Sequence, residues 1–500
     1  MADTDTDTLR LALDDLYPAP AAPLTRLSPR TWPGITPQST ETLRSVLKDN
    51  QQRWHVFFDP DYRPHNHAVH YVLALWAMGA DAEIIQAAYD LDCTYLLPRF
   101  ESPARITAAN YDQHFGDANY YSAYLDFFND VVREKGVAQA VEEYVFDLKA
   151  NFVDGKTAGQ DQPEMLNRFM DGIIHPMIHV GNGLEFGLPG LVAEGLAWTA
   201  VHFPSSSLVI PASLWETTTT TQSAAQGNTH ALTIISRIAN DARFDAVPRV
   251  ELYYDIFSST TAKYSEAINA YVRAWSYDRT DPGEVERKIE ELVWANTVIY
   301  AVGGWTEGEA FNADFFLAHL VTSSLFLSPI AAHLTPASQE LLCRSYFAVC
   351  LTWWIGRGRP TFDIPSFFAS TSLSPSLSPP SSSPPQRRNK HALPSPDSPK
   401  ALTPNAWLQL VQESLTVPDE HLPKTLRALA HFADIYGRRP RGDPVLVKGT
   451  ELEGKECLDG TLFVRAAVLT NEKLRGEKAE EVEFKDAGLW ERRGFYKSSS

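Results

Sequence analysis

The chain has only four cysteines among its 500 residues, and no two of them form a C-x-x-C pair. The scattered Cys93, Cys343, Cys350 and Cys457 therefore predict neither a disulfide framework nor a thiolate zinc site. Such cysteine use is typical of a reducing compartment, and we expect a cytoplasmic protein. The first seven residues are acidic and polar, without a basic segment or an apolar stretch, and predict no secretory signal peptide.

Positive charge and long hydrophobic runs are also scarce. The formal net charge is −18 at pH 7, which disfavours nucleic acid and anionic membrane surfaces because both recruit basic patches. The apolar stretch at residues 347–355 is far shorter than the roughly 20 residues that a membrane-spanning helix needs. We therefore expect no nucleic-acid partner and no membrane partner.

Several common catalytic motifs are absent. The sequence contains no H-E-x-x-H pair, no G-x-x-x-x-G-K-[ST] phosphate loop, no G-x-S-x-G elbow and no G-x-G-x-x-G after a strand. These absences disfavour zincin chemistry, P-loop phosphate binding, serine hydrolysis and a flavin or nicotinamide fold.

The residues that are present predict an all-α fold. Helical periodicity dominates residues 41–360 and resumes at 405–436, while strand-like alternation is scarce. We predict a single large helical domain over residues 41–445, after an extended lead-in of residues 1–40. The expected helices are 40–51, 67–78, 82–88, 120–132, 137–148, 189–202, 261–275, 282–298, 314–327, 338–355 and 422–436.

Three segments depart from the helical pattern. Ser or Pro fills thirteen of the sixteen positions 370–385, and such a segment cannot bury enough apolar surface to offset its ordering entropy. We expect residues 366–402 to be a disordered insertion within the domain, and the Thr-rich residues 217–226 to be a loop. The tail, residues 446–500, is rich in Lys and Glu with weak alternation at 462–465, and is expected to pack on the outside.

Fourteen histidines, several in apolar surroundings, supply the candidate site. His175 and His179 form an H-x-x-x-H pair, and residues four apart on a helix share a face. Because Pro176 fits the first turn of a helix, His175 is expected at the helix start. Gly181 and Gly183 predict a tight turn soon after the pair. A metal would satisfy several buried imidazoles at once, whereas core or capping histidines are the alternative.

Two other apolar stretches carry candidate residues. His67 and His70 lie three residues apart, and either is a candidate ligand, with a supporting or capping role for the other. His319 stands alone, and a core histidine is the alternative. We take Thr322 as the candidate catalytic residue, since its hydroxyl can hold a bound water or substrate. Its alternative is a hydrogen bond within its own helix.

Four blocks of the sequence resemble the questin oxidase-like family of fungal enzymes. They are residues 66–75 with 78–80, 175–197, 316–324 and 419–424, in the family's order. The resemblance implies an oxidoreductase of secondary metabolism, an oxygenase that cleaves the ring of an anthraquinone-type polyketide with dioxygen. The Ser/Pro-rich insertion and the C-terminal tail depart from the family pattern.

The resemblance also implies a metal site with Fe(II) as the expected cofactor. Carried over by motif, the ligands are His67, His175, His179, His319 and Lys424, with His70 as the alternative to His67. A buried amine has a lowered pKa and reacts with carbon dioxide to give a carbamate, an anionic oxygen donor. Imidazoles with such an oxygen suit iron(II) and leave room for dioxygen.

Two other functions stay open. A metal-free, NADPH-dependent Baeyer–Villiger oxidase would use the same histidines as acid–base groups. A non-catalytic helical binding protein would keep them as structural residues. Stoichiometric iron favours the oxygenase, NADPH consumption without metal favours the Baeyer–Villiger oxidase, and ligand binding without either favours the binding protein.

Overall fold

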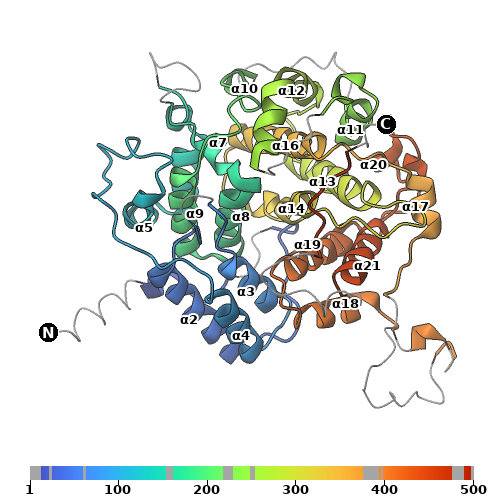
Figure 1. Cartoon of the computed structure of the whole chain (residues 1–500), viewed down its shortest axis with the longest axis horizontal. Helices are drawn as coiled ribbons and strands as arrows, with labels where there is room; N and C mark the ends of the chain where they lie inside the picture. The colour runs from blue at the N-terminus through green and yellow to red at the C-terminus, as the bar shows by residue number, and fades with distance from the viewer. Residues whose placement is uncertain are drawn as a thin grey trace.

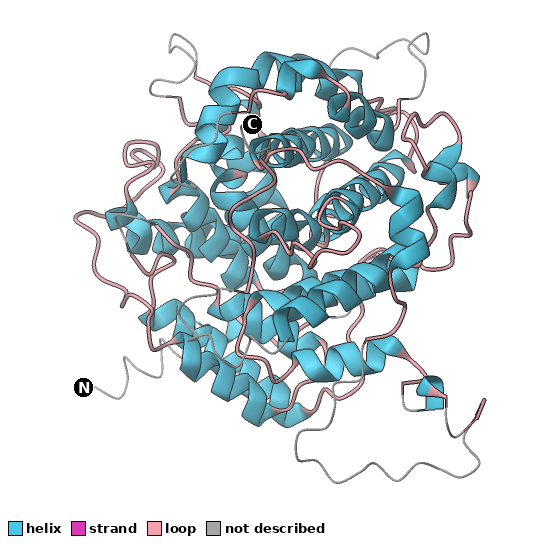
Figure 2. Ribbon diagram, turned by 45° about the vertical axis from the view of Figure 1, so that its right-hand side comes forward, coloured by secondary structure: helices cyan, strands magenta, loops and turns pink. Residues whose placement is uncertain are grey.

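In the computed structural model, the described part of the chain consists of helices joined by loops and turns (Figure 2). Within that part there is no β-strand, which confirms the predicted all-α fold. Residues 218–228 and 376–392 lie outside it, so the predicted loop and most of the predicted insertion are not covered. The described residues are 13–21, 25–59, 63–153, 162–217, 229–247, 254–375, 393–395, 398–401, 403–475 and 489–496.

Each of the expected helices overlaps a helix of the structure. The first half contains α2 (Pro37–Arg53), α3 (Ala68–Ala77), α4 (Ala82–Asp92), α5 (Tyr121–Lys135), α6 (Val137–Val141), α7 (Met165–Phe169), α8 (Asp171–Phe186), α9 (Pro189–Val201), α10 (Ser213–Thr217) and α11 (Ala231–Ala239). The second half contains α12 (Tyr254–Ala274), α13 (Glu284–Thr297), α14 (Phe315–Ser324), α15 (Leu327–Ala331), α16 (Pro336–Gly356), α17 (Ile364–Ser370), α18 (Ala406–Ser414), α19 (His421–Tyr436), α20 (Pro444–Val447) and α21 (Leu462–Arg475).

Helix α9 lies between α5 and α8 in the left half of Figure 1 and is buried along almost its whole length. Its close crossing with α8 depends on glycines. A Cβ added at Gly195 would lie 2.9 Å from the backbone N of Val180, and one at Gly183 would lie 2.8 Å from that of Val192. Gly181 and Gly183 lie inside α8, so the predicted tight turn is wrong. Their missing side chains let neighbouring elements approach, which is the signal that the sequence carried.

The start of α8 has an unusual backbone. Gly172, Ile173 and Ile174 have positive φ angles of 54°, 56° and 67°, so regular α-helical geometry begins at His175. Pro176 is then in the first turn, as the sequence predicted. Left-handed β-branched residues are rare and strained, and such strain concentrates at functional sites.

The C-terminal tail differs from its prediction. Residues 462–465, which alternate weakly, begin helix α21, whose Leu462 and Phe463 are fully buried and which packs against α19. A later stretch, residues 489–496, lies between α14 and α19. The Phe315 amide donates to the Glu491 carbonyl at 2.9 Å, and the Trp490 indole donates to Asp419 at 3.0 Å. These two described parts of the tail therefore pack into the core, and the expected outer position is wrong for them.

Two smaller observations complete the fold. Helix α17 occupies the first positions of the segment that was predicted as an insertion, residues 366–402. Among the described residues, no helix has the combination of length and apolar character that crossing a bilayer requires.

Candidate functional site

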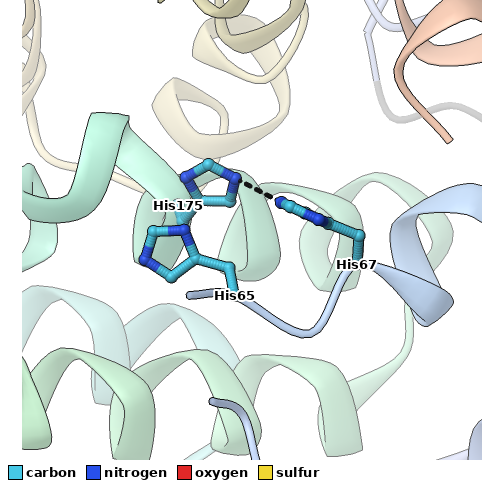
Figure 3. Close-up of side chains that lie close together, drawn as sticks. All are labelled: His65, His67 and His175. Carbon is cyan, nitrogen blue, oxygen red and sulfur yellow. Dashed lines mark hydrogen bonds between the residues drawn. The ribbon is translucent and has the colours of Figure 1, made fainter. Parts of the chain in front are cut away.

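Five imidazole rings meet where α3, α8, α14 and α19 converge. They belong to His65, His67, His175, His319 and His421, and Figure 3 shows the first three side by side. The ring centroids of His65 and His175 are 3.9 Å apart, and those of His67 and His421 are 4.8 Å apart. His319 lies 5.0 Å from both His175 and His421. Helices that are distant in the sequence thus deliver their histidines to one point.

Three Nδ1 atoms of this cluster lie beside acceptors that cannot donate a hydrogen. His175 Nδ1 donates to the Gly172 carbonyl at 2.5 Å, and His319 Nδ1 donates to the Phe315 carbonyl at 2.7 Å. His67 Nδ1 lies 3.3 Å from a Glu420 carboxylate oxygen. A neutral imidazole with its hydrogen on Nδ1 has a lone pair on Nε2. The three Nε2 atoms are therefore acceptors.

These Nε2 atoms point at each other or at no protein partner. His67 Nε2 and His175 Nε2 are 2.8 Å apart, the contact that is dashed in Figure 3. Two lone pairs that face each other need a cation between or beside them. The Nε2 atoms of His319 and His421 are buried without a hydrogen-bond partner among the described residues. One nitrogen from each of His67, His319 and His421 lies within 4.8 Å of the other two, and His65, His67 and His175 form a second such group.

Burial keeps these histidines neutral. It lowers the pKa of His67 to about 4 and that of His319 to about 3, chiefly because the charged form loses its solvation. The pKa values of His175 and His421 fall well below the usual range, first through burial; the neighbouring His65 lowers that of His175 further, and Lys424 lowers that of His421 further. Neutral imidazoles are the form that binds a metal, so the donor set fits a metal ion.

Lys424 lies one turn after His421 on α19. It lines a small cavity of about 20 Å³ together with His70, His175, His319, His421 and Thr322, which is room for about one water-sized molecule. Burial lowers the pKa of Lys424 to about 8, against the opposing attraction of Glu420, Asp419 and Asp92.

The structure brings together most of the predicted site residues. His67, His175 and His319 belong to the cluster, while Lys424 and Thr322 line the small cavity beside it. The Thr322 hydroxyl donates to the carbonyl of His319 at 3.3 Å, which is the alternative that the sequence left open.

His179 and His70 face each other instead. His179 Nδ1 lies 3.0 Å from His70 Nε2, and His179 Nε2 lies 3.3 Å from Glu194 Oε2. The Tyr17 hydroxyl donates to the other oxygen of Glu194. His179 is therefore one turn deeper than His175 and outside both nitrogen groups, although the H-x-x-x-H spacing predicts that they share a target.

Two cluster members were missed by sequence reasoning. His421 stands three residues before Lys424, and that spacing places both on one helix face, so a signal was present. His65 lies two residues before His67 on a loop, where no helical period can reveal it.

A large cavity of about 720 Å³ lies on the other side of the imidazole cluster. His175 and His421 line both cavities, so their rings separate the two spaces. The volume falls within the range of small-molecule sites. The aromatic residues of its lining are Phe58, Tyr95, Phe203, Phe257, Phe315, Phe316 and Trp353.

Charged groups also reach the large cavity. The Arg492 guanidinium, from the C-terminal stretch, lies 4.5 Å from the centroid of the Phe315 ring. Arg63 lies 3.9 Å from the Phe203 ring centroid. A flat aromatic molecule with polar edges matches such walls.

Comparison with known proteins gives several fungal relatives. The chain is 29% identical over 321 residues to the oxidoreductase AflY of Aspergillus parasiticus, over 61% of each chain. It is 26% identical to a questin oxidase of Aspergillus terreus, over 65% of this chain and 71% of the relative. It is also 26% identical to a Baeyer-Villiger oxidase of Pestalotiopsis microspora, over 67% and 74%. The chain thus spans less than two thirds of the length of the first of these relatives.

The family comparison covers the histidine cluster in full. Residues 64–429 match the model of the questin oxidase-like family. This range begins just before His65 and ends just after Lys424. It therefore contains both nitrogen groups and the residues of α14 and α19 that line the two cavities. The chain belongs to the questin oxidase-like family.

Proposed function

We propose that this chain is a non-haem iron oxygenase that uses dioxygen to cleave the ring of an anthraquinone-type polyketide in secondary metabolism. The inward-facing Nε2 atoms carry the proposal, because four buried, neutral imidazoles next to a cavity with aromatic walls call for a metal ion. The names of the fungal relatives, one oxidoreductase and two oxidases, support an oxidative reaction.

His67, His175, His319 and His421 would hold the iron, and Lys424 would add an oxygen donor from the small cavity. The lysine amine gains this oxygen by adding to carbon dioxide and losing one proton, which gives a carbamate. Hydrogen bonds from Nδ1 to the Gly172 and Phe315 carbonyls fix the ring orientations, as in many metal sites. Bound Fe(II) would supply the redox chemistry that activates dioxygen.

The chain's own residues would bind and orient the substrate. Phe316 stacks on Trp353 at a centroid distance of 5.1 Å, and together with Phe315 they form an apolar wall for a flat ring system. Thr322 remains the proposed catalytic hydroxyl, on the small-cavity side.

The test combines metal analysis with dioxygen uptake. We expect about one iron per chain after reconstitution, dioxygen uptake that requires both iron and a hydroxyanthraquinone, and a ring-opened product that carries oxygen from labelled dioxygen. His175→Ala should lose the iron, while His179→Gln should keep it. His333→Ala is the matched control, because that histidine also bonds a backbone carbonyl, that of Pro329, but lines neither cavity.

A metal-free, NADPH-dependent Baeyer–Villiger oxidase is the second proposal, favoured by the name of the Pestalotiopsis relative. In that enzyme the same imidazoles would move protons. Their lowered pKa values make them poor proton carriers at neutral pH, which favours the first proposal. Substrate oxidation that consumes NADPH in iron-free protein would reverse this order.

A further inference from the structure

A second polar group faces the large cavity from the end of α9. His202 Nδ1 lies 2.9 Å from a carboxylate oxygen of Asp171. Because the carboxylate accepts, Nδ1 carries the hydrogen and Nε2 carries the lone pair. This Nε2 is buried and has no hydrogen-bond partner among the described residues, and His202 lines the large cavity.

The surrounding residues hold the His202 ring in place. Its ring lies 5.1 Å from Phe57 in an edge-on arrangement and 6.1 Å from Trp198. Arg168 donates to the His202 carbonyl, and Arg63 donates to the preceding carbonyl, that of Val201, at 2.9 Å. The backbone that carries His202 is therefore anchored on both sides of the peptide.

Gly172 makes room for the ring. A Cβ at this position would lie 2.6 Å from His202 Cε1 and 2.6 Å from His65 Nε2. The left-handed Gly172 thus lets His202 and His65 approach the backbone beside Asp171. The charged or titratable groups that interact with the pair are Arg63, Arg168 and His65.

Other cavity histidines are less suited to take a proton from a substrate. His67 and His421 lie 3.3 Å and 3.4 Å from the same Glu420 carboxylate oxygen, and they belong to the proposed iron site. His175 has a backbone carbonyl, not a carboxylate, at its Nδ1. Only His202, among the described histidines that line this cavity, has a carboxylate within 3.0 Å and stands outside the proposed ligand set.

We propose that His202 is the base that receives the proton of a phenolic hydroxyl on the substrate, and that Asp171 is its positioning residue. In this step the phenol O–H bond breaks, its electron pair stays on oxygen, and the proton forms an N–H bond at Nε2. Asp171 balances the charge of the imidazolium, as carboxylates do in His–Asp pairs. No electron is transferred in the step.

This inference rests on the proposed function and names the residue that takes the proton from the hydroxyl of the substrate. A phenolate gives up electrons more easily than its phenol, so its formation prepares the ring for oxidation. The proton is held on the large-cavity side, away from Lys424 and Thr322.

The test uses 2-hydroxyanthraquinone, whose absorption moves to longer wavelength when its single hydroxyl ionises and which has no adjacent donor to chelate iron. It is titrated anaerobically into the iron-loaded enzyme at a pH below its ionisation in water. We expect the wild type to bind it as the phenolate. His202→Gln should bind it as the neutral phenol, and should retain iron while kcat falls about 100-fold or more. His333→Gln should match the wild type.

Asp171→Asn provides a second measurement that does not require His202 to be replaced. It should lower the bound phenolate fraction about tenfold with little change in iron content. A full phenolate spectrum in His202→Gln, or in Asp171→Asn if the first variant does not fold, overturns the inference and leaves the proposed function standing. A wild type that keeps its iron but does not bind the probe overturns both.

Discussion

At the residue scale, the hydrogen-bond partner of Nδ1 decides whether Nε2 of the same imidazole carries a hydrogen or a lone pair. His175 and His319 give their Nδ1 hydrogens to main-chain carbonyls three and four residues back in the sequence. The local backbone therefore sets the tautomer before any ligand arrives. His67 depends instead on Glu420, from a distant part of the chain. A helical sequence implies only a partner such as the Phe315 carbonyl, which lies one turn before His319 in the same helix.

Lys424 gives the first residue-scale prediction. If its carbamate donates an oxygen, Lys424→Ala should lose most of the activity and regain part of it with added formate or acetate, which can enter the vacated space. Lys424→Arg should stay inactive, since arginine remains cationic and offers no oxygen. Activity is measured as dioxygen uptake at a fixed iron content.

The matched control for Lys424 is Lys288, a second buried lysine. Its Nζ lies 2.6 Å from Glu291, and it lines neither cavity. A short carboxylate should not increase the activity of Lys288→Ala. An active Lys424→Arg enzyme would show that Lys424 is structural, and the imidazoles would then be the only proposed ligands.

The sequence contained part of this site. His67, His175 and His319 were predicted because apolar helical stretches and family blocks surround them. His202 was not, because its partner Asp171 is 31 residues away and the pair forms only when α9 packs on α8. The structure places His179 against His70 and outside both nitrogen groups, since helical spacing shows which side a residue takes but not which neighbour it meets there.

At the scale of elements, the left-handed residues 172–174 at the start of α8 position side chains of both the imidazole cluster and the His202–Asp171 pair. Gly172 presents its carbonyl to His175 and its bare Cα to His65 and His202. A run of three left-handed residues cannot be read from Asp171–Gly172–Ile173–Ile174, because isoleucine strongly avoids that region. The surrounding helices impose it.

Gly172→Ala should therefore do more damage than its backbone angle alone explains. Left-handed geometry costs a non-glycine residue roughly 1–2 kcal/mol. The new methyl would also displace the rings of His65 and His202, so 2-hydroxyanthraquinone should bind at least about tenfold more weakly. Urea denaturation and the anaerobic titration measure the two effects.

Gly449→Ala is the control for backbone strain, since Gly449 has a φ of 74° with nothing within 4 Å of an added Cβ. It should lose stability without losing probe affinity. Equal losses of affinity in both variants would show that general destabilisation, and not the position of the rings, is responsible.

Element prediction worked best where periodicity alone decides the outcome. The helices that carry His67, His319 and Lys424 were located from their apolar patterns. The prediction for the tail was wrong because the weak alternation at residues 462–465 resembles that of a strand. Burial against α19 instead makes this segment a helix. Tertiary contacts override such short signals.

At the scale of the whole molecule, the protein contains many buried histidines that are neutral at pH 7. Nine described histidines have lowered pKa values, with burial as the main cause, and outnumber the six carboxyl groups whose pKa is raised. The histidines are His55, His65, His67, His70, His175, His230, His319, His421 and His431. The carboxyl groups are Asp92, Glu164, Glu185, Glu290, Asp314 and Asp419.

Stability should therefore fall in mild acid. His55 and His431 each have a pKa of about 4, below the value of the unfolded chain. The unfolded chain takes up the proton first, so stability present above about pH 6.5 is lost as the pH falls towards 4. We expect the free energy of unfolding of the iron-free protein to drop by at least about 2 kcal/mol between pH 7 and pH 5.

Urea denaturation at several pH values measures this change. Carboxyl groups with raised pKa values, such as Asp92 at about 8, work in the opposite direction and reduce the slope. A free energy of unfolding that is constant or rises between pH 7 and pH 5 would contradict this prediction.

The two cavities on either side of the imidazole rings differ in the size of the molecule that each can hold. On one side is a space of about 720 Å³, and on the other a space of about 20 Å³. A fused-ring molecule fits only the first, whereas the second has room for about one water-sized molecule. The rings of His175 and His421 therefore stand between any bulky electrophile in the large cavity and the amine of Lys424.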